Sequence, residues 1–447
     1  MTYNRKKQWA ALALVALFSA NALAKATAEE LARLGNDLTP VGAEMAGNNE
    51  GSIPAWTGGL VKPPAGYVAG KGWIDPFASD KPLFTITAAN AEQYKDKLAP
   101  GQLALLKKYP EYKMIVYPTH RTAGAPPSVY DAVKAEADKA QADASGNAVL
   151  NVKHSTVPFP LPKSGLEVIW NSLFRYRTAG LVRPTTNFPV QSNGDFTPVR
   201  STETVLLPYA MKEPSDNLLY LYKTTFSAPS SLAGESILVH ESIDQVKQPR
   251  RAWVYNPGSR RVLRAPEIAY DSPSSGTDAL ATTDDYDGFN GAPDRFDFKL
   301  LGKKEMFIAY NAFKLADKSV KYSQLIKPTV MNQDFIRYEL HRVWVVEGTL
   351  RKGANHVYGK RVYFIDEDSW QIAHGDLYDG RGELWRVREQ YGMQFYEAPV
   401  FSYAGATQYD LQSRRYVSSG LTNEEPQIRW NVPLTEADFT TGALKRD

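Results

Sequence analysis

Hydrophobic and polar residues alternate with a period of two along much of the chain after residue 200. Alternation of this kind predicts strands that bury one face. The predicted strands cover residues 202–210, 217–226, 235–243, the two arms of a hairpin within 252–271, 305–313, 335–350, 360–367, 370–379 and 382–392. Short turn sequences such as Asn256-Pro257-Gly258 separate several of them. Connections this short predict an antiparallel sheet, because parallel strands need long crossovers.

A helical period replaces this alternation in the earlier part of the chain. Three charged, Ala-rich segments have the composition of exposed helices: residues 89–98, 101–109 and 128–144. A fourth segment, 164–177, begins with Ser164 and Glu167 in the spacing of a capping box. Its apolar residues fall on one face: Leu166, Ile169, Trp170, Leu173 and Phe174. We therefore expect this helix to be buried against a broad apolar surface.

The first 24 residues have the organisation of a secretory signal peptide. Basic residues at 5–7 precede an apolar run at 9–20, and Ala22-Leu23-Ala24 follows. The run is shorter than the roughly 20 apolar residues of a membrane span, and the alternative is an uncleaved anchor helix. We expect cleavage before Lys25, export to the periplasm and a mature chain without a transmembrane segment.

Composition and charge argue against two classes of protein. The formal net charge of +3 falls to 0 without residues 1–24, which hold three basic and no acidic residues. Nucleic-acid affinity rests on a concentrated basic field, so we do not expect a nucleic-acid-binding protein. The chain has no cysteine, which excludes a diacylglyceryl anchor on a cysteine thiol and leaves core burial as the source of stability.

The sequence contains no recognisable catalytic motif. The six histidines are scattered without the zincin spacing, and the Gly-Xaa-Ser-Xaa-Gly, Walker and dinucleotide motifs are absent. An EF-hand loop that started at Asp285 would need Gly and Glu where Asn290 and Phe296 stand. We therefore predict no catalytic residue, no metal site and no cofactor.

Residues 267–296 form a long segment rich in Asp, Ser, Gly and Pro between predicted strands. Long loops in compact domains are uncommon and are usually lids, binding loops or disordered segments. We expect a mobile segment near the mouth of a cavity, because such segments seldom bury backbone groups. The alternative is a simple surface excursion. If the protein were an exported hydrolase, this segment would supply its carboxylates: Asp284, Asp285, Asp287 and Asp294.

Aromatic and aliphatic residues of the predicted strands are candidates for lining an apolar cavity. The strand around Trp344 is apolar on both faces, and such a sheet must be covered on both or must line a cavity. The candidate lining residues are Trp253, Tyr255, Val262, Leu340, Trp344, Val346, Tyr363 and Trp385. The candidate rim residues, suited to an anionic headgroup or an acidic partner surface, are Arg260, Arg261 and Arg264. The alternatives are core packing for the aromatic residues and ion pairs with sheet carboxylates for the arginines.

Four stretches of sequence resemble known proteins. The segments WVYNPGSRRVLRAPE and KRVYFIDEDSWQIAHGDLYDGRGELWRVRE are similar to the outer-membrane lipoprotein-sorting and lipid-carrier fold, over about residues 200–395. The segments TPVGAEMAGNNEGSIPAWTGG and WNSLFRYR resemble the exported family called domain of unknown function 1329, over most of the mature chain. The resemblance implies an α+β fold in which a large curved antiparallel sheet, an unclosed half-barrel, wraps helices and encloses an apolar cavity. It also implies a periplasmic protein that works beside a lipid exporter of the resistance-nodulation-division (RND) type.

The predicted organisation has four parts: a signal peptide (1–24), an N-terminal extension that is irregular and then helical and packs on the main domain (25–160), a half-barrel domain (161–400) and a C-terminal tail (401–447). We predict a non-enzymatic periplasmic carrier or chaperone for a hydrophobic, lipid-like ligand, working with an RND-type exporter and an outer-membrane protein. One alternative is an adaptor that bridges a transporter to the outer membrane, with its interior filled by side chains. The other is an exported lipid or glycan hydrolase.

Overall fold

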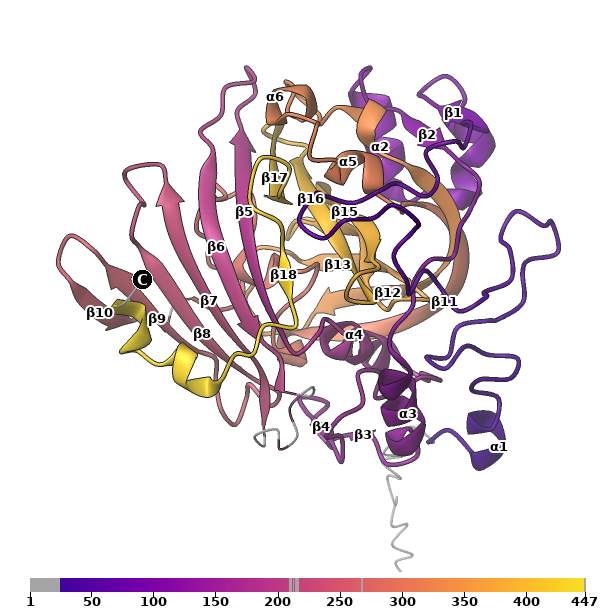
Figure 1. The fold of residues 1–447 in the computed structure, drawn as a ribbon, viewed down its shortest axis with the longest axis horizontal. Coiled ribbons are helices and arrows are strands. Elements are labelled where there is room, and N and C mark those ends of the chain that lie inside the picture. Colours follow the sequence, from indigo (N-terminus) through magenta and orange to yellow (C-terminus); the bar gives the residue numbers. More distant parts are fainter. Residues whose placement is uncertain (1–24, 209–210, 212, 214–216, 267, 446–447) are drawn as a thin grey trace, which may run out of the picture.

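The structure is a computed structural model that describes residues 25–208, 211, 213, 217–266 and 268–445 (Figure 1). The expected signal peptide lies outside these residues. Among the described helices, none has the length and apolar character needed to cross a lipid bilayer.

One large sheet dominates the fold (Figure 1). Its strands lie in the order β1 (Phe84–Ile86), β2 (Met114–Val116), β12 (Tyr338–Leu350), β13 (Lys360–Asp366), β14 (Ile372–Tyr378), β15 (Leu384–Phe395), β16 (Val400–Asp410), β17 (Arg415–Leu421), β5 (Gly180–Val190), β6 (Val199–Leu206), β7 (Leu218–Ala228), β8 (Ser236–Ser242), β9 (Arg251–Asn256) and β10 (Arg261–Arg264). Two further strands pair off this path, β11 (Phe296–Ala309) with β12 and β18 (Arg429–Trp430) with β5. The path ends at β1 and β10 without joining them, so the sheet is the predicted unclosed half-barrel.

The strands follow the alternation of the sequence where one face is buried. In β6 every second residue from Val199 onward is buried, and the residues between them are exposed or half-buried over most of the strand. Neighbouring strands pair antiparallel, as predicted, except for one parallel contact between Tyr338 of β12 and Val116 of β2. Strands β5, β16 and β17 are additional to the predicted ones. Strands β16 and β17 fall almost entirely within the residues predicted as a C-terminal tail, 401–447, and they lie in the middle of the sheet.

The predicted buried helix is α4 (Gly165–Phe174), and it starts as its sequence indicates. The hydroxyl of Ser164 accepts a hydrogen bond from the backbone N–H of Glu167 at 3.2 Å. Its apolar face packs against β11 and β12, with Trp170 in one core with Val346. The other helices are α1 (Ala28–Leu31), α2 (Pro100–Lys108), α3 (Pro127–Glu136), α5 (Phe313–Ala316), α6 (Tyr322–Leu325) and the 3-10 helix η1 (Ala91–Lys97).

The N-terminal extension packs on the sheet (Figure 1). Leu105 and Tyr109 of α2 share a core with Tyr391 and Met393 of β15. The start of α2 also binds the sheet, because the N–H of Gly101 donates to Oδ2 of Asp376 at 3.1 Å. A short separate hairpin, β3 (Gln141–Ala142) with β4 (Val149–Leu150), follows α3.

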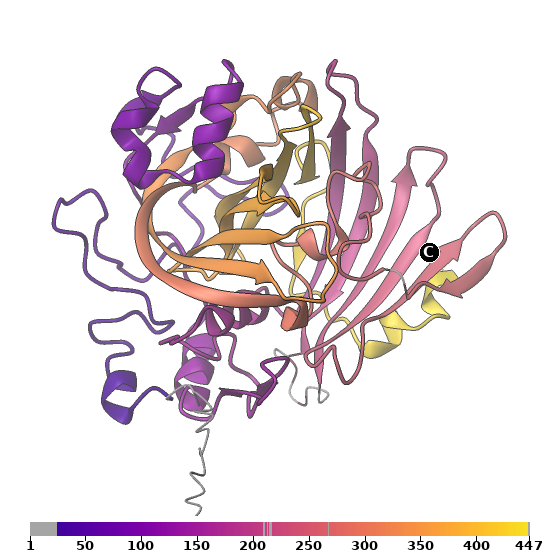
Figure 2. The same ribbon diagram turned by 180° about the vertical axis from the view of Figure 1, so that it is seen from behind.

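The segment from 268 to 295 lies inside the fold, between β7 and β8 on one side and β13 to β16 on the other (Figure 2). It contains two short 3-10 helices, η3 (Thr283–Asp285) and η4 (Pro293–Arg295). Asp284 and Asp285 are each only 1% exposed. Much of the segment is therefore buried and is not the simple surface excursion of the alternative, because arginine, tyrosine and glutamine side chains from other elements satisfy its carboxylates.

Candidate functional site

A cavity of about 150 Å³ lies between residues 268–295, here named the inserted segment, and strands β5 to β8, and residues of β15 to β17 also line it. One part of its wall is apolar and is formed by Phe226, Ile237, Val239 and Ile268. Other lining residues are polar or charged, among them Arg183, Glu203, Arg388 and Tyr403. A cavity lined by both apolar and charged residues suits an amphipathic ligand.

The cavity floor contains a buried ion pair between β5 and β6. Arg183 donates from Nε and Nη2 to Oε2 of Glu203 at 2.8 and 2.5 Å, and Tyr403 and Tyr222 hydrogen-bond to the pair. Burial disfavours the charged form of Arg183, but Glu203 together with the neighbouring Tyr403 and Tyr286 outweighs burial and raises the pKa of Arg183 well above its usual range. The guanidinium therefore stays charged, and its hydrogen bonds fix the polar groups of the floor.

Arginines from other elements hold the acidic residues of the inserted segment. Asp287 accepts from Arg175 and Arg177, which follow α4, at 2.5 and 2.6 Å. Burial raises the pKa of Asp287, but these guanidinium groups outweigh it and the net pKa is lowered. Asp284 accepts from Arg361 of β13 at 2.7 Å. Asp284 and Asp287, two of the four carboxylates that the hydrolase alternative would use, are thus engaged in ion pairs that anchor the segment.

Arg388 of β15 is the exception among the arginines that line the cavity. It is 7% exposed, and its Nη1 donates to the amide oxygen of Gln408 at 3.1 Å. Its Nε has no hydrogen-bond partner, and no carboxylate of the described residues lies within ion-pair distance of it. The cavity therefore contains one buried guanidinium with most of its donors unused.

The candidate lining residues from the sequence lie in three separate cores. Trp253, Tyr255 and Val262 pack around Leu238 against the C-terminal turns η6 (Glu436–Phe439) and η7 (Ala443–Lys445). Leu340 lies in the core under the N-terminal extension. The remaining four pack in or against the core around α4: Trp344, Val346, Tyr363 and Trp385.

None of these eight residues lines the 150 Å³ cavity. Trp344 borders a different, shallow depression beside Arg33 and Lys303. The candidate rim residues Arg260, Arg261 and Arg264 are exposed on the last hairpin, away from the cavity.

Sequence reasoning missed the polar strand residues that line the cavity, such as Arg183, Glu203 and Arg388. Of the lining residues it named Asp285 and Asp287, as carboxylates of the hydrolase alternative. A signal for one of the missed residues exists in β15, where Arg386, Arg388 and Gln390 occupy alternate positions of a strand that is buried over most of its length. Polar residues on one face of a buried strand indicate a polar interior that needs partners. Arg183 and Glu203 show no comparable pattern, because their pairing depends on the register between β5 and β6.

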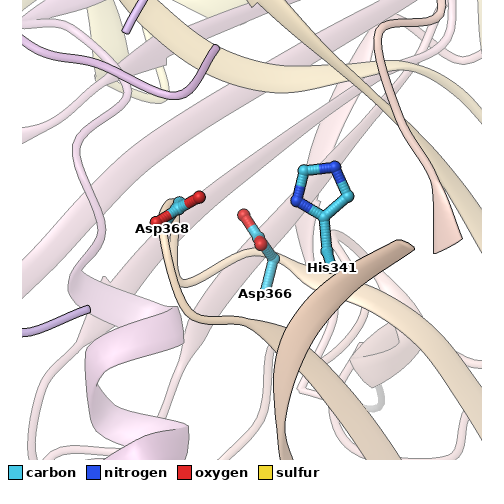
Figure 3. Close-up of side chains that lie close together, drawn as sticks. All are labelled: His341, Asp366 and Asp368. Atoms are coloured by element: carbon cyan, nitrogen blue, oxygen red, sulfur yellow. The ribbon is translucent and has the colours of Figure 1, made fainter. Parts of the chain in front are cut away.

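A second polar cluster lies where the N-terminal extension meets the sheet (Figure 3). His341, Asp366 and Asp368 each place one potential metal-ligand atom within 4.8 Å of the others. Both carboxylate oxygens of Asp368 accept from Arg121, at 2.9 and 2.7 Å. Burial, and then the neighbouring Asp368, raises the pKa of Asp366 to about 7. A metal ion bound by these three residues would compete with Arg121 for the Asp368 carboxylate. The main role of the cluster is therefore the ion pair that joins the N-terminal extension to the sheet.

Comparison with known proteins gives a family match. The family model described as "Protein of unknown function (DUF1329)" matches residues 85–445. The chain is also 49% identical over 441 residues to a Pseudomonas aeruginosa protein named "Uncharacterized protein PA3922", which covers 97% of this chain and 96% of the relative.

Two solved structures are similar to parts of the chain. A DUF1329 family protein from Desulfovibrio piger has a TM-score of 0.42 at 16% identity, covering 60% of this chain and 92% of that one. A LolA superfamily protein, NE2245 from Nitrosomonas europaea, has a TM-score of 0.39 at 11% identity, covering 63% and 100%.

Proposed function

This chain belongs to the DUF1329 family, and for this member of it we propose the function of a periplasmic carrier that binds an amphipathic, lipid-like ligand in the cavity beside the inserted segment. The observation that carries the proposal is the lining of this cavity, which combines the apolar wall with the charged floor residues Arg183 and Glu203 and with Arg388. Periplasmic location rests on the signal-peptide pattern of residues 1–24. Transfer of the ligand to or from an RND-type exporter rests on the resemblance described above.

The size of the cavity limits what it holds. A cavity of about 150 Å³ is comparable to an apolar cavity that binds benzene, so it accommodates one end of a lipid rather than a whole molecule. Burial of roughly five methylene groups contributes ~4 kcal/mol, which corresponds to a Kd of about 1 mM. Useful affinity therefore requires polar contacts in the cavity or a longer chain that continues beyond its mouth.

The adaptor alternative has one observation in its favour. The inserted segment and α4 fill much of the space inside the half-barrel, with Phe289 of the segment and Trp170 of the helix in the same core. A filled interior is what a protein that only bridges two partners would have. The two functions differ in whether the mature protein binds an amphiphile at the cavity.

Ligand binding at the cavity is testable with a variant that fills it. Val239 lines the apolar wall, and Val239→Phe places a ring in the cavity. The matched control is Val262→Phe, which makes the same change on β10 at a residue that does not line the cavity.

We would measure co-purifying lipid by native mass spectrometry and displacement of a fluorescent fatty-acid probe. The carrier function predicts that the parent and Val262→Phe bind the probe and that Val239→Phe does not. A parent that carries no lipid and binds no probe would contradict the carrier and leave the adaptor.

A further inference from the structure

The guanidinium of Arg388 lies in the cavity without an anionic partner. An arginine has five N–H donors, and here only Nη1 has a protein acceptor, the Gln408 amide oxygen at 3.1 Å. The edge formed by Nε and Nη2 makes no hydrogen bond to any described residue. That edge is the part of the group that binds a carboxylate or a phosphate through two parallel hydrogen bonds.

The other two arginines that line the cavity have carboxylate partners. Arg183 pairs with Glu203, and Arg250 pairs with Glu241 at 2.6 Å. Burying a charge without a partner is unfavourable, and water in the cavity offsets only part of that loss. Arg388 is therefore the one lining cation, among the described residues, whose charge a ligand could neutralise.

Asp285 also lines the cavity but does not neutralise Arg388. Its Oδ2 accepts from the Tyr358 hydroxyl at 2.9 Å and from the Gln408 amide nitrogen at 3.0 Å. Gln408 thus stands between the two groups, with its nitrogen on Asp285 and its oxygen on Arg388. Asp285 holds the amide in the orientation that presents an acceptor to Nη1 and leaves Nε and Nη2 of Arg388 without a protein acceptor among the described residues.

Residues that line the same cavity as Arg388 suit the headgroup of an acyl amphiphile. Ser201 and Ser419 are among them, and a serine hydroxyl can donate to an anionic oxygen. The apolar wall then receives the first carbons of the chain.

We propose that Arg388 binds the acidic headgroup of the carried ligand, a carboxylate or a phosphate monoester on an acyl or alkyl chain. The inference rests on the proposed carrier function and deepens it by naming the charge that the ligand bears. The exposed arginines of the last hairpin then play no part in recognising the headgroup.

The experiment compares three ligands of equal chain length: decanoate, decyl phosphate and 1-decanol. Their Kd values for the mature protein are measured by calorimetry or probe displacement with the parent, Arg388→Gln, Arg388→Lys and, as the matched control, Arg261→Gln. Charge-assisted hydrogen bonds correspond to roughly a 10- to 100-fold difference in Kd. We expect one or both acids to bind the parent that much more tightly than the alcohol, and their ranking identifies the headgroup as carboxylate or phosphate.

Arg388→Gln should remove the tighter binding of the acids and leave 1-decanol binding unchanged. Arg388→Lys should keep part of the difference between acid and alcohol because the positive charge remains. Arg261→Gln should bind all three ligands as the parent does. Arg388→Gln should also unfold at a temperature no lower than the parent, because it removes an unpaired buried charge. Equal binding of acid and alcohol to the parent, or an equal loss of both in Arg388→Gln, would overturn the headgroup role and leave the carrier function standing. Failure of all three ligands to bind the parent would overturn both.

Discussion

Replacing Asp284 by Asn tests whether the inserted segment is held by buried ion pairs. Asp284 is 1% exposed and accepts from Arg361 at 2.7 Å, from His356 at 3.0 Å and from the Thr282 hydroxyl at 2.7 Å. Arg361 is completely buried, and Asp284 is its one carboxylate partner among the described residues. The substitution keeps the shape of the side chain but leaves the guanidinium without a counter-charge.

The expected loss is large because the surviving charge cannot reach water. Removing one partner of a buried ion pair destabilises a protein by roughly 3–5 kcal/mol. The matched control is Asp278→Asn in the same segment. Asp278 pairs with Arg415, but its side chain is 53% exposed, and exposed pairs contribute about 0–1 kcal/mol. The two substitutions make the same chemical change, so burial is the variable.

We would measure the free energy of unfolding by urea denaturation of the parent and both variants, followed by tryptophan fluorescence. Burial raises the pKa of Asp284, but Arg361, His356 and Thr282 together outweigh burial and the net pKa is lowered. Its stabilising contribution is therefore complete at neutral pH and is lost as the pH falls below about 4, where an unfolded carboxylate gains a proton. The difference between parent and Asp284→Asn should shrink over that range. A loss below about 1 kcal/mol at pH 7, or equal losses in both variants, would refute this reasoning.

Three further predictions concern other parts of the molecule. N-terminal sequencing of the periplasmic protein should find a chain that starts at Lys25, whereas Met1 retained in a membrane pellet would contradict export by cleavage. Trp344→Ala should lower the free energy of unfolding by ~2 kcal/mol, since the ring is half-buried against Trp370, and should leave probe binding unchanged because Trp344 does not line the cavity. Asp366 has a pKa of about 7 in the folded protein, so stability should fall as the pH rises from about 4 to 7, and Asp366→Asn should flatten this profile in thermal unfolding.

Local patterns in the sequence determined most of the regular elements. The alternation in β6 and the capping residue of α4 each specify an element without help from the rest of the chain. Strand β16 has no alternation to read, because every one of its residues is buried. Strand β5 contains Pro184 and Pro189, which argue against a central strand, yet it lies between β17 and β6.

The candidate site depended on the tertiary structure. The composition of residues 267–296 is typical of a solvated loop. The buried carboxylates of the inserted segment are stabilised by arginines from other elements: Arg175 and Arg177 after α4, and Arg361 of β13. Arg388 meets Gln408 through the register of β15 with β16, and it meets the apolar wall of β7 and β8 because the sheet curves around the inserted segment. The sequence specifies each residue and its strand, but the partners of a buried charge lie on other strands. Register and curvature bring them together, and both are set by the packing of the whole core.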